Sequence, residues 1–115
     1  MGSLMVKISS KVIDKKVLVG TVESPKVNTD LPDNAEVGDK LTPQVTVLRA
    51  DNSTPIKGVK VDFFYSDSFG VATLGYSETD INGIAIAPTS YYIDDAQAGT
   101  EIHFLFQIRG KKIWN

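Results

Sequence analysis

The side chains that most often carry enzyme chemistry are sparse in this chain. Its 115 residues include one histidine, His103, and no cysteine. His103 therefore has neither a second imidazole nor a thiolate with which to share a proton or a metal ion. It lies between Ile102 and Phe104 in an alternating run, which places the imidazole on the solvent side of a strand. We interpret His103 as a surface residue.

No sequence motif indicates a catalytic serine either. The sequence contains neither a G-x-S-x-G elbow, which would present a serine on a sharp strand-to-helix turn, nor a phosphate-binding glycine loop. We therefore expect a protein that is not an enzyme and that uses no cofactor. The serines in question are Ser9, Ser10, Ser66, Ser68 and Ser77.

Carboxylates are the remaining candidates for chemistry, because calcium takes roughly six to eight oxygen ligands. The favoured interpretation is that these acidic residues only keep loops soluble. The segment from Asp80 to Gly83 is not interpreted as a calcium loop, because Ile84 occupies the next ligand position and no glutamate closes it. The weak calcium candidates are Asp30, Asp33 and Asp39 in one cluster, which also contains Glu36, and Asp94 and Asp95 in another.

The composition is that of a folded globular protein. Hydrophobic residues make up 42% of the chain and charged residues 23%, so neither disorder nor membrane insertion is expected. The net charge is only -2 and no basic stripe with interleaved aromatic residues occurs, so nucleic acid is not expected as a partner. The lack of cysteine excludes disulfides and thiolate zinc sites.

The N-terminus lacks a basic segment followed by an apolar core, so a secretory signal is not predicted. Residues 1–4 resemble a cloning scar ahead of a native Met5, which would make this a small complete protein. The alternative is a segment cut from a longer secreted protein. In both cases we expect residues 5–115 to form one domain.

Hydrophobic periodicity predicts an all-β protein. No window keeps apolar residues at helical spacing without β-branched runs, glycine or proline. Apolar and polar residues alternate instead in four runs, which predicts half-buried strands separated by turns. These runs are Leu41 to Arg49, Val59 to Ser66, Ile84 to Ala87 and Glu101 to Arg109.

The first part of the chain is expected to add further strands. Met5 to Ile13 and Val17 to Val22 are β-branched runs separated by Asp14-Lys15-Lys16, which predicts a hairpin. Glu23 to Asp39 is rich in proline, asparagine and aspartate, which predicts a loop or an edge crossing, with a short linker as the alternative.

Several motifs resemble bacterial immunoglobulin-like domains of the invasin and intimin type (the Big family). Val37-Gly38-Asp39, Val45-Thr46-Val47 and the run from Pro55 to Phe63 resemble the opening half of such a domain. Thr79 to Ala85 resembles the turn before the family's fifth strand, and Ala98 to Ile102 resembles the entry to its sixth. Their order and spacing agree with the family.

This resemblance implies an immunoglobulin-like β-sandwich of about seven strands in two antiparallel sheets. An extra N-terminal strand or hairpin would be added to it. Residues 37–110 would form the family-like core and residues 5–36 the preceding strands and loop.

The residues of two turns predict their backbone conformation on physical grounds, independently of the family resemblance. In the Asp80 turn, Asn82 and Gly83 are expected at positive φ, and the Asp80 carboxylate can accept from the backbone two residues on. A bulky residue at Gly83 should break this turn. Pro55 fixes φ in a second turn, and Gly58 permits a left-handed residue before the next strand.

The family's usual final strand does not fit, because only six residues follow Arg109. We expect Met5 to Ile13 to fill the vacant place beside the strand that contains Phe104, since an open edge there would invite aggregation. The same segment of a neighbouring chain is the alternative, which would produce a strand-exchanged homodimer.

Some apolar residues fall where their strands should face water, which indicates contact with another domain or protomer. Phe64 and Leu105 are expected on one sheet, as the third and sixth strands pair in such sandwiches. The alternative is that the N-terminal strands or loop tyrosines cover them. The candidate interaction residues are Leu48, Phe64, Leu105, Tyr91, Tyr92 and Trp114.

The expected function is that of a passive structural or adhesive module at a microbial cell surface, which acts as a spacer or binds proteins through its strand edges and loops. Its partner would be a protein: a neighbouring domain, a protomer or a host surface protein. One alternative is a decoration or structural protein of a phage or virion. Another is a carbohydrate-binding accessory module that uses Tyr76, Tyr91 and Tyr92 as stacking platforms. A Lys-to-Asn crosslink is not expected, because the lysines lie in turns or on outward phases.

Overall fold

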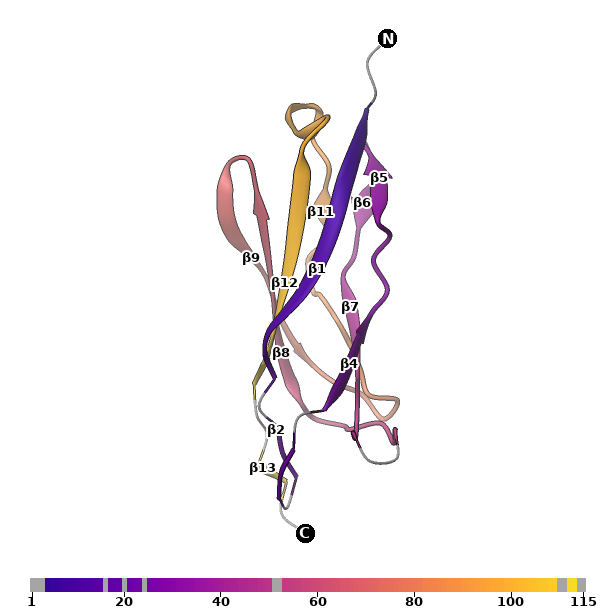
Figure 1. Ribbon diagram of the computed structural model, residues 1–115, viewed down its shortest axis with the longest axis vertical. Coiled ribbons are helices and arrows are strands. Elements are labelled where there is room, and N and C mark those ends of the chain that lie inside the picture. Colours follow the sequence, from indigo (N-terminus) through magenta and orange to yellow (C-terminus); the bar gives the residue numbers. More distant parts are fainter. Residues whose placement is uncertain are drawn as a thin grey trace.

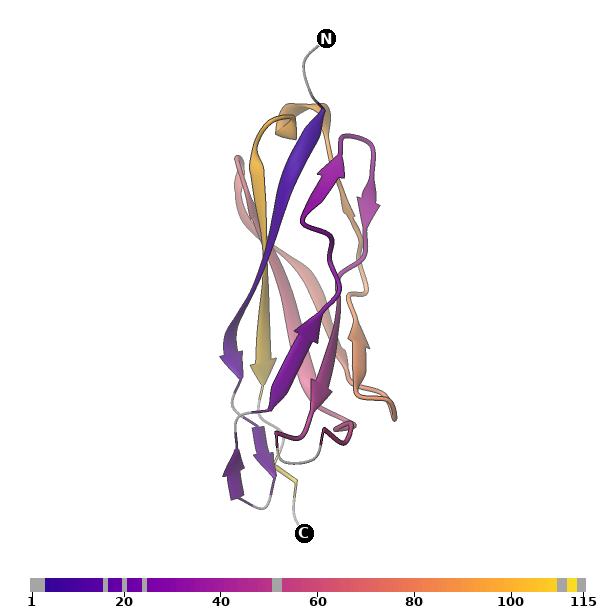
Figure 2. The same cartoon turned by 45° about the vertical axis from the view of Figure 1, so that its right-hand side comes forward.

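The computed structural model describes residues 4–15, 17–19, 21–23, 25–50, 53–109 and 112–113. These residues form an elongated all-β body with extents of 58 × 23 × 19 Å, and the prediction of an all-β protein is confirmed. Figures 1 and 2 show two layers of strands that face one another, as in a sandwich. No described helix has the length and hydropathy needed to span a membrane.

The larger layer is a five-stranded sheet with the order β5-β1-β12-β8-β9. Its middle strand, β12, alternates buried residues with exposed or half-buried ones, because one face covers the core and the other faces solvent. The strands are β5 (Asn34–Glu36), β1 (Met5–Lys15), β12 (Glu101–Arg109), β8 (Lys60–Asp67) and β9 (Gly70–Glu78).

Strand β1 fills the place beside β12 within the same chain. It pairs with β12 in parallel, from Lys7 opposite Glu101 to Lys15 opposite Ile108, and it pairs with β5 on its other side. The predicted use of Met5 to Ile13 is therefore confirmed in its intramolecular form. The expectation of two purely antiparallel sheets is wrong for this layer, because the slot is filled by a strand that runs in the same direction as β12.

The second layer is built from shorter strands in two sheets, β10-β7-β4 and β11-β6. A 3-10 helix, η1 (Asp95–Gln97), precedes β12. The strands are β4 (Lys26–Thr29), β6 (Lys40–Leu41), β7 (Gln44–Leu48), β10 (Ile84–Ile86) and β11 (Tyr91–Tyr92).

Two predictions about the first part of the chain need correction or detail. The segment from Glu23 to Asp39, predicted as a loop or edge crossing, contains two edge strands, of which β4 lies between Pro25 and Pro32 and β5 follows Pro32. The predicted hairpin at Asp14-Lys15-Lys16 is wrong, because β1 pairs with β12 and β5 instead. A small separate sheet contains β2 (Val17–Val19), β3 (Thr21–Glu23) and β13 (Lys112–Ile113).

The core lies between the two layers and is largely aliphatic and aromatic. The rings of Phe63 and Phe106 meet edge to face, with 5.8 Å between centroids. Because β8 and β12 pair antiparallel, their inward residues align in rows. The fully buried large side chains include Val45, Val47, Val59, Val61, Phe63, Ile93, Ile102, Phe104, Phe106 and Ile108.

The Asp80 turn forms as its sequence predicts, with one difference. Asp80 Oδ1 accepts from the backbone N of Asn82 at 2.8 Å and from that of Ile84 at 3.0 Å. Gly83 has a φ of +76° and Gly58 one of +80°, so both glycines adopt left-handed conformations. Asn82 does not share this conformation, because Ser53 is the only described non-glycine residue with positive φ.

Candidate interaction face

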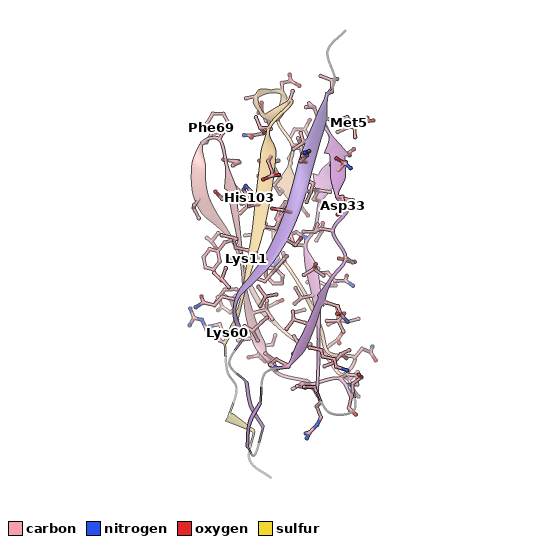
Figure 3. All side chains as sticks on the ribbon, viewed as in Figure 1. Met5, Lys11, Asp33, Lys60, Phe69 and His103 are labelled. Atoms are coloured by element: carbon pink, nitrogen blue, oxygen red, sulfur yellow. The ribbon has the colours of Figure 1, made fainter. Side chains whose placement is uncertain are left out.

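The solvent side of the five-stranded sheet carries the candidate residues Phe64, Leu105 and His103. We call it the outer face and define it by the outward residues of β1, β12, β8 and β9. The strand register sets these residues in rows that cross the sheet. Figure 3 shows Lys11, His103 and Lys60 on this side of the molecule.

Phe64 and Leu105 form the apolar centre of the outer face. They are direct register partners on β8 and β12, as predicted, and both are half-buried. Lys11 on β1 and Thr73 on β9 complete the row. Two adjacent half-buried apolar side chains between polar neighbours form a small apolar patch on this face.

Leu48 does not belong to this surface. It lies on β7 in the other layer, where it pairs with Lys26 and forms an isolated bridge with Pro55. Its side chain is half-buried. The alternation of the sequence placed Leu48 correctly off the core, but periodicity could not tell which sheet would carry it. Trp114 lies outside the described residues.

A charged and aromatic cluster lies at one end of the outer face. Asp62 is 7% exposed although it points outward, because Arg109 covers it and donates from Nε to Asp62 Oδ2 at 2.5 Å. The Lys60 ammonium lies over the ring of Tyr76, 4.0 Å from the centroid. These two contacts fix four polar side chains in place beside the apolar centre.

His103 has two partners that sequence reasoning missed. Ser9 Oγ lies 2.6 Å from His103 Nδ1, and Glu101 Oε1 lies 3.1 Å from His103 Nε2. Ser9 is 94 residues away in sequence, so only the pairing of β1 with β12 brings it to the imidazole. The arrangement holds the imidazole in one orientation across two strands.

The connectivity of Ser9, His103 and Glu101 resembles a hydrolase relay, but a hydrolase would also need a substrate cleft and oxyanion donors beside the serine. An open hollow of about 400 Å³ lies at the start of β1, yet neither Ser9 nor His103 lines it. His103 and Glu101 are both about half exposed to solvent. The three side chains therefore form a hydrogen-bonded group that is open to solvent on the outer face.

Three residues of one row of the sheet line the hollow. Lys7 pairs with Asn34 on one side and with Glu101 on the other. These are the residue types of a Lys-to-Asn crosslink. All three side chains are exposed, however, whereas that reaction requires an amine shielded from water.

The acidic clusters are not assembled into a metal site. Among the described residues, no group of three or more histidine, aspartate or glutamate side chains is placed to hold an ion. Asp39 Oδ2 accepts from the backbone N of Glu36 at 2.9 Å, and Asp94 Oδ1 accepts from that of Ala96 at 3.0 Å. Both therefore cap local turns. The other calcium candidates, Asp30, Asp33 and Asp95, are exposed.

The prediction that Tyr91 is a contact or stacking residue is wrong. Tyr91 is 6% exposed, and its ring meets those of Tyr65 and Phe104 at centroid distances of 4.6 and 5.6 Å. Its hydroxyl donates to Asp67 Oδ2 at 2.7 Å. Burial raises the pKa of the phenol, and the hydrogen bond and charge of Asp67 raise this pKa further.

Tyr92 and Tyr76 remain exposed, at 64% and 60%. Tyr92 lies on β11, which pairs with β6, whereas Tyr76 lies on β9 in the other layer. The three tyrosines considered as stacking platforms therefore do not share a face.

Comparisons of this chain with protein families, with curated proteins and with solved structures found no significant match.

Proposed function

We propose that the chain is a non-catalytic immunoglobulin-like structural module of a microbial cell-surface protein, acting as a spacer and as a protein-binding domain. The observation that carries the proposal is the parallel pairing of β1 with β12. Two parallel strands start at the same end of a sheet and finish at the same end. The chain thus enters at one end of the body and completes its last long strand at the other (Figure 1).

This layout suits modules joined in series. When entry and exit lie at opposite ends, the long axis of 58 Å adds to the length of a stalk. Strand β1 also occupies the place that the family resemblance leaves without a strand after Arg109. It closes that edge without help from a second chain.

The same pairing favours resistance to a stretching force. A pull between the start of β1 and the end of β12 loads their register pairs, from Lys7–Glu101 to Lys15–Ile108, in shear, so many backbone hydrogen bonds must fail together. A pull on two points at the same end would instead separate the strands one hydrogen bond at a time. A spacer on a cell surface would experience the first kind of load.

Single-molecule pulling tests this role. The chain contains no cysteine, so pairs of introduced cysteines define the points of attachment. Leu4→Cys with Gln107→Cys places the attachment points near opposite ends of the β1–β12 pair, and Leu4→Cys with Ala96→Cys places both at the same end. We expect a clearly higher rupture force for the first pair. Equally low forces for both pairs would count against a load-bearing spacer.

The protein-binding part of the proposal rests on the outer face, where Phe64 and Leu105 lie side by side. Antibodies against the chain should label intact cells of the source microbe, and surface proteolysis should remove the label. Labelling only after lysis would contradict a surface location. Labelling of virus particles instead of cells would favour the virion alternative.

A further inference from the structure

Strand β9 leaves part of one sheet edge open. It is the terminal strand of the five-stranded sheet, and among the described residues it pairs only with β8. Its first eight residues, Gly70 to Ser77, include no charged residue and no proline. The β8–β9 register shifts between Phe63 and Phe64, so a bulge opposite that point ends the regular segment. The regular open part of the edge is Gly70 to Thr73.

The other edge strands of the five-stranded sheet, and those of the sheet β10-β7-β4, are protected in the usual ways. Short length, charge and proline all discourage a further strand from pairing with an edge. β5 has three residues, ends in Glu36 and follows Pro32. β10 also has three residues and precedes Pro88, and β4 begins with Lys26 directly after Pro25. Strand β9 has none of these features along its first eight residues.

Exposed apolar side chains lie beside the open edge. Phe69 is 76% exposed and Val71 is 67% exposed, and Figure 3 shows Phe69 at the tip of the β8–β9 hairpin. A shallow hollow of about 140 Å³ lies beside them and is bordered by Tyr65 and Ala72. An incoming strand would therefore find both unpaired backbone groups and apolar surface at the same place.

We infer that β9 pairs with β9 of a second copy of this chain, antiparallel about a two-fold axis. Unpaired backbone N–H and C=O groups along an edge require an extended strand as partner. Because Gly70 to Ser77 is uncharged, two copies can face one another without like-charge repulsion. Since the other large edges are protected, identical edges meet, and such a contact closes as a dimer instead of growing into a fibre.

The dimer would join two five-stranded sheets edge to edge. It uses the side of the body, whereas the serial arrangement of modules uses the two ends. The inference therefore does not depend on the proposed spacer role, and a failed pulling experiment would leave it untouched.

Sedimentation equilibrium of the full chain tests the inference, over a range from about 10 µM to about 1 mM. We expect a monomer–dimer equilibrium that Val71→Lys weakens about tenfold or more, because it places two like charges close to the two-fold axis. Ile81→Lys is the matched control, since Ile81 is 75% exposed but lies in the Asp80 turn. It should leave the association unchanged. If Val71→Lys loses its β-sheet circular dichroism, Thr73→Lys replaces it.

Cysteine crosslinking locates the contact. In this cysteine-free chain, Ala72→Cys or Thr73→Cys should oxidise to a disulfide-linked dimer, because facing strands bring their Cα atoms within reach of a disulfide. Tyr92→Cys, exposed on β11, should not. A chain that stays monomeric at the highest concentration would overturn the inference. The β9 edge would then be open to pairing with a strand of another protein. A dimer that survives Val71→Lys, or that Ile81→Lys disrupts, would overturn it as well.

Discussion

The Tyr91 hydroxyl donates a hydrogen bond of 2.7 Å to Asp67 Oδ2 and so joins β11 to the end of β8. The other carboxylate oxygen, Oδ1, accepts from the backbone N of Phe69 at 2.8 Å. Asp67 thus connects the tip of the β8–β9 hairpin to the opposite layer through the buried ring of Tyr91. The start of β9 is therefore linked to both layers.

Tyr91→Phe should lower the free energy of unfolding by about 2 kcal/mol. The substitution keeps the ring but leaves a part-buried carboxylate without its phenol donor, and hydrogen bonds to charged groups contribute more than neutral ones. Urea unfolding measures the change. Tyr92→Phe is the control, because Tyr92 is 64% exposed and should alter stability little. Equal effects of the two variants would contradict this prediction.

Tyr91 should also make stability fall at alkaline pH. Its pKa is raised in the folded state, so its contribution is fully present below the ordinary tyrosine pKa of about 10. Above that pH the unfolded chain releases the phenol proton while the folded chain retains it, and stability is lost as pH rises. Unfolding titrations above pH 10 should therefore show a smaller decline in Tyr91→Phe than in the wild type.

Gly83→Ala should destabilise the protein strongly, by about 2–4 kcal/mol. A Cβ at Gly83 would lie 2.6 Å from the backbone O of Val47, in addition to the strain of a φ of +76°. Gly38→Ala separates the two causes, because Gly38 has a φ of +96° but open space around its Cβ. Thermal unfolding should show a smaller loss for Gly38→Ala. A loss at Gly38 as large as that at Gly83 would assign the effect to φ alone.

Ser77→Ala should leave stability unchanged or raise it by up to about 1 kcal/mol. The Ser77 hydroxyl is buried and has no hydrogen-bond partner in the described structure, so its removal relieves a desolvation cost. Chemical denaturation of the variant measures the change. A clear loss of stability would show that the hydroxyl is hydrogen-bonded in solution.

Ile8→Ala should cost about 2–4 kcal/mol if β1 packs within its own chain. Ile8 is 7% exposed and pairs with Ile102 in the core, whereas its neighbour Lys7 is exposed. Lys7→Ala should therefore have little effect.

Deletion of residues 1–13 should expose the edge of β12 and cause aggregation. A stable monomer after this deletion would contradict the role assigned to β1.

Only part of the candidate site could be predicted from the sequence. Alternation placed Phe64 and Leu105 off the core, and the family's strand order predicted that they would share a sheet. The contacts of His103 were not predictable, because Ser9 reaches it only through a parallel pairing of the two ends of the chain. Tyr91 was misjudged because Tyr91-Tyr92 carries no periodicity that tells which of two adjacent rings turns inward.

The sequence by itself determined the class of the protein. Period-two alternation in the runs around Val45, Phe63 and Phe104 produces strands with one apolar face, and the Asp80–Gly83 turn follows from local backbone chemistry. Only the tertiary structure decided which edges meet and which stay open. Strand β1 pairs in parallel with β12, and β9 keeps a free edge. Backbone hydrogen bonds form between strands of almost any sequence, so the choice of neighbouring strand depends on how the whole layer packs.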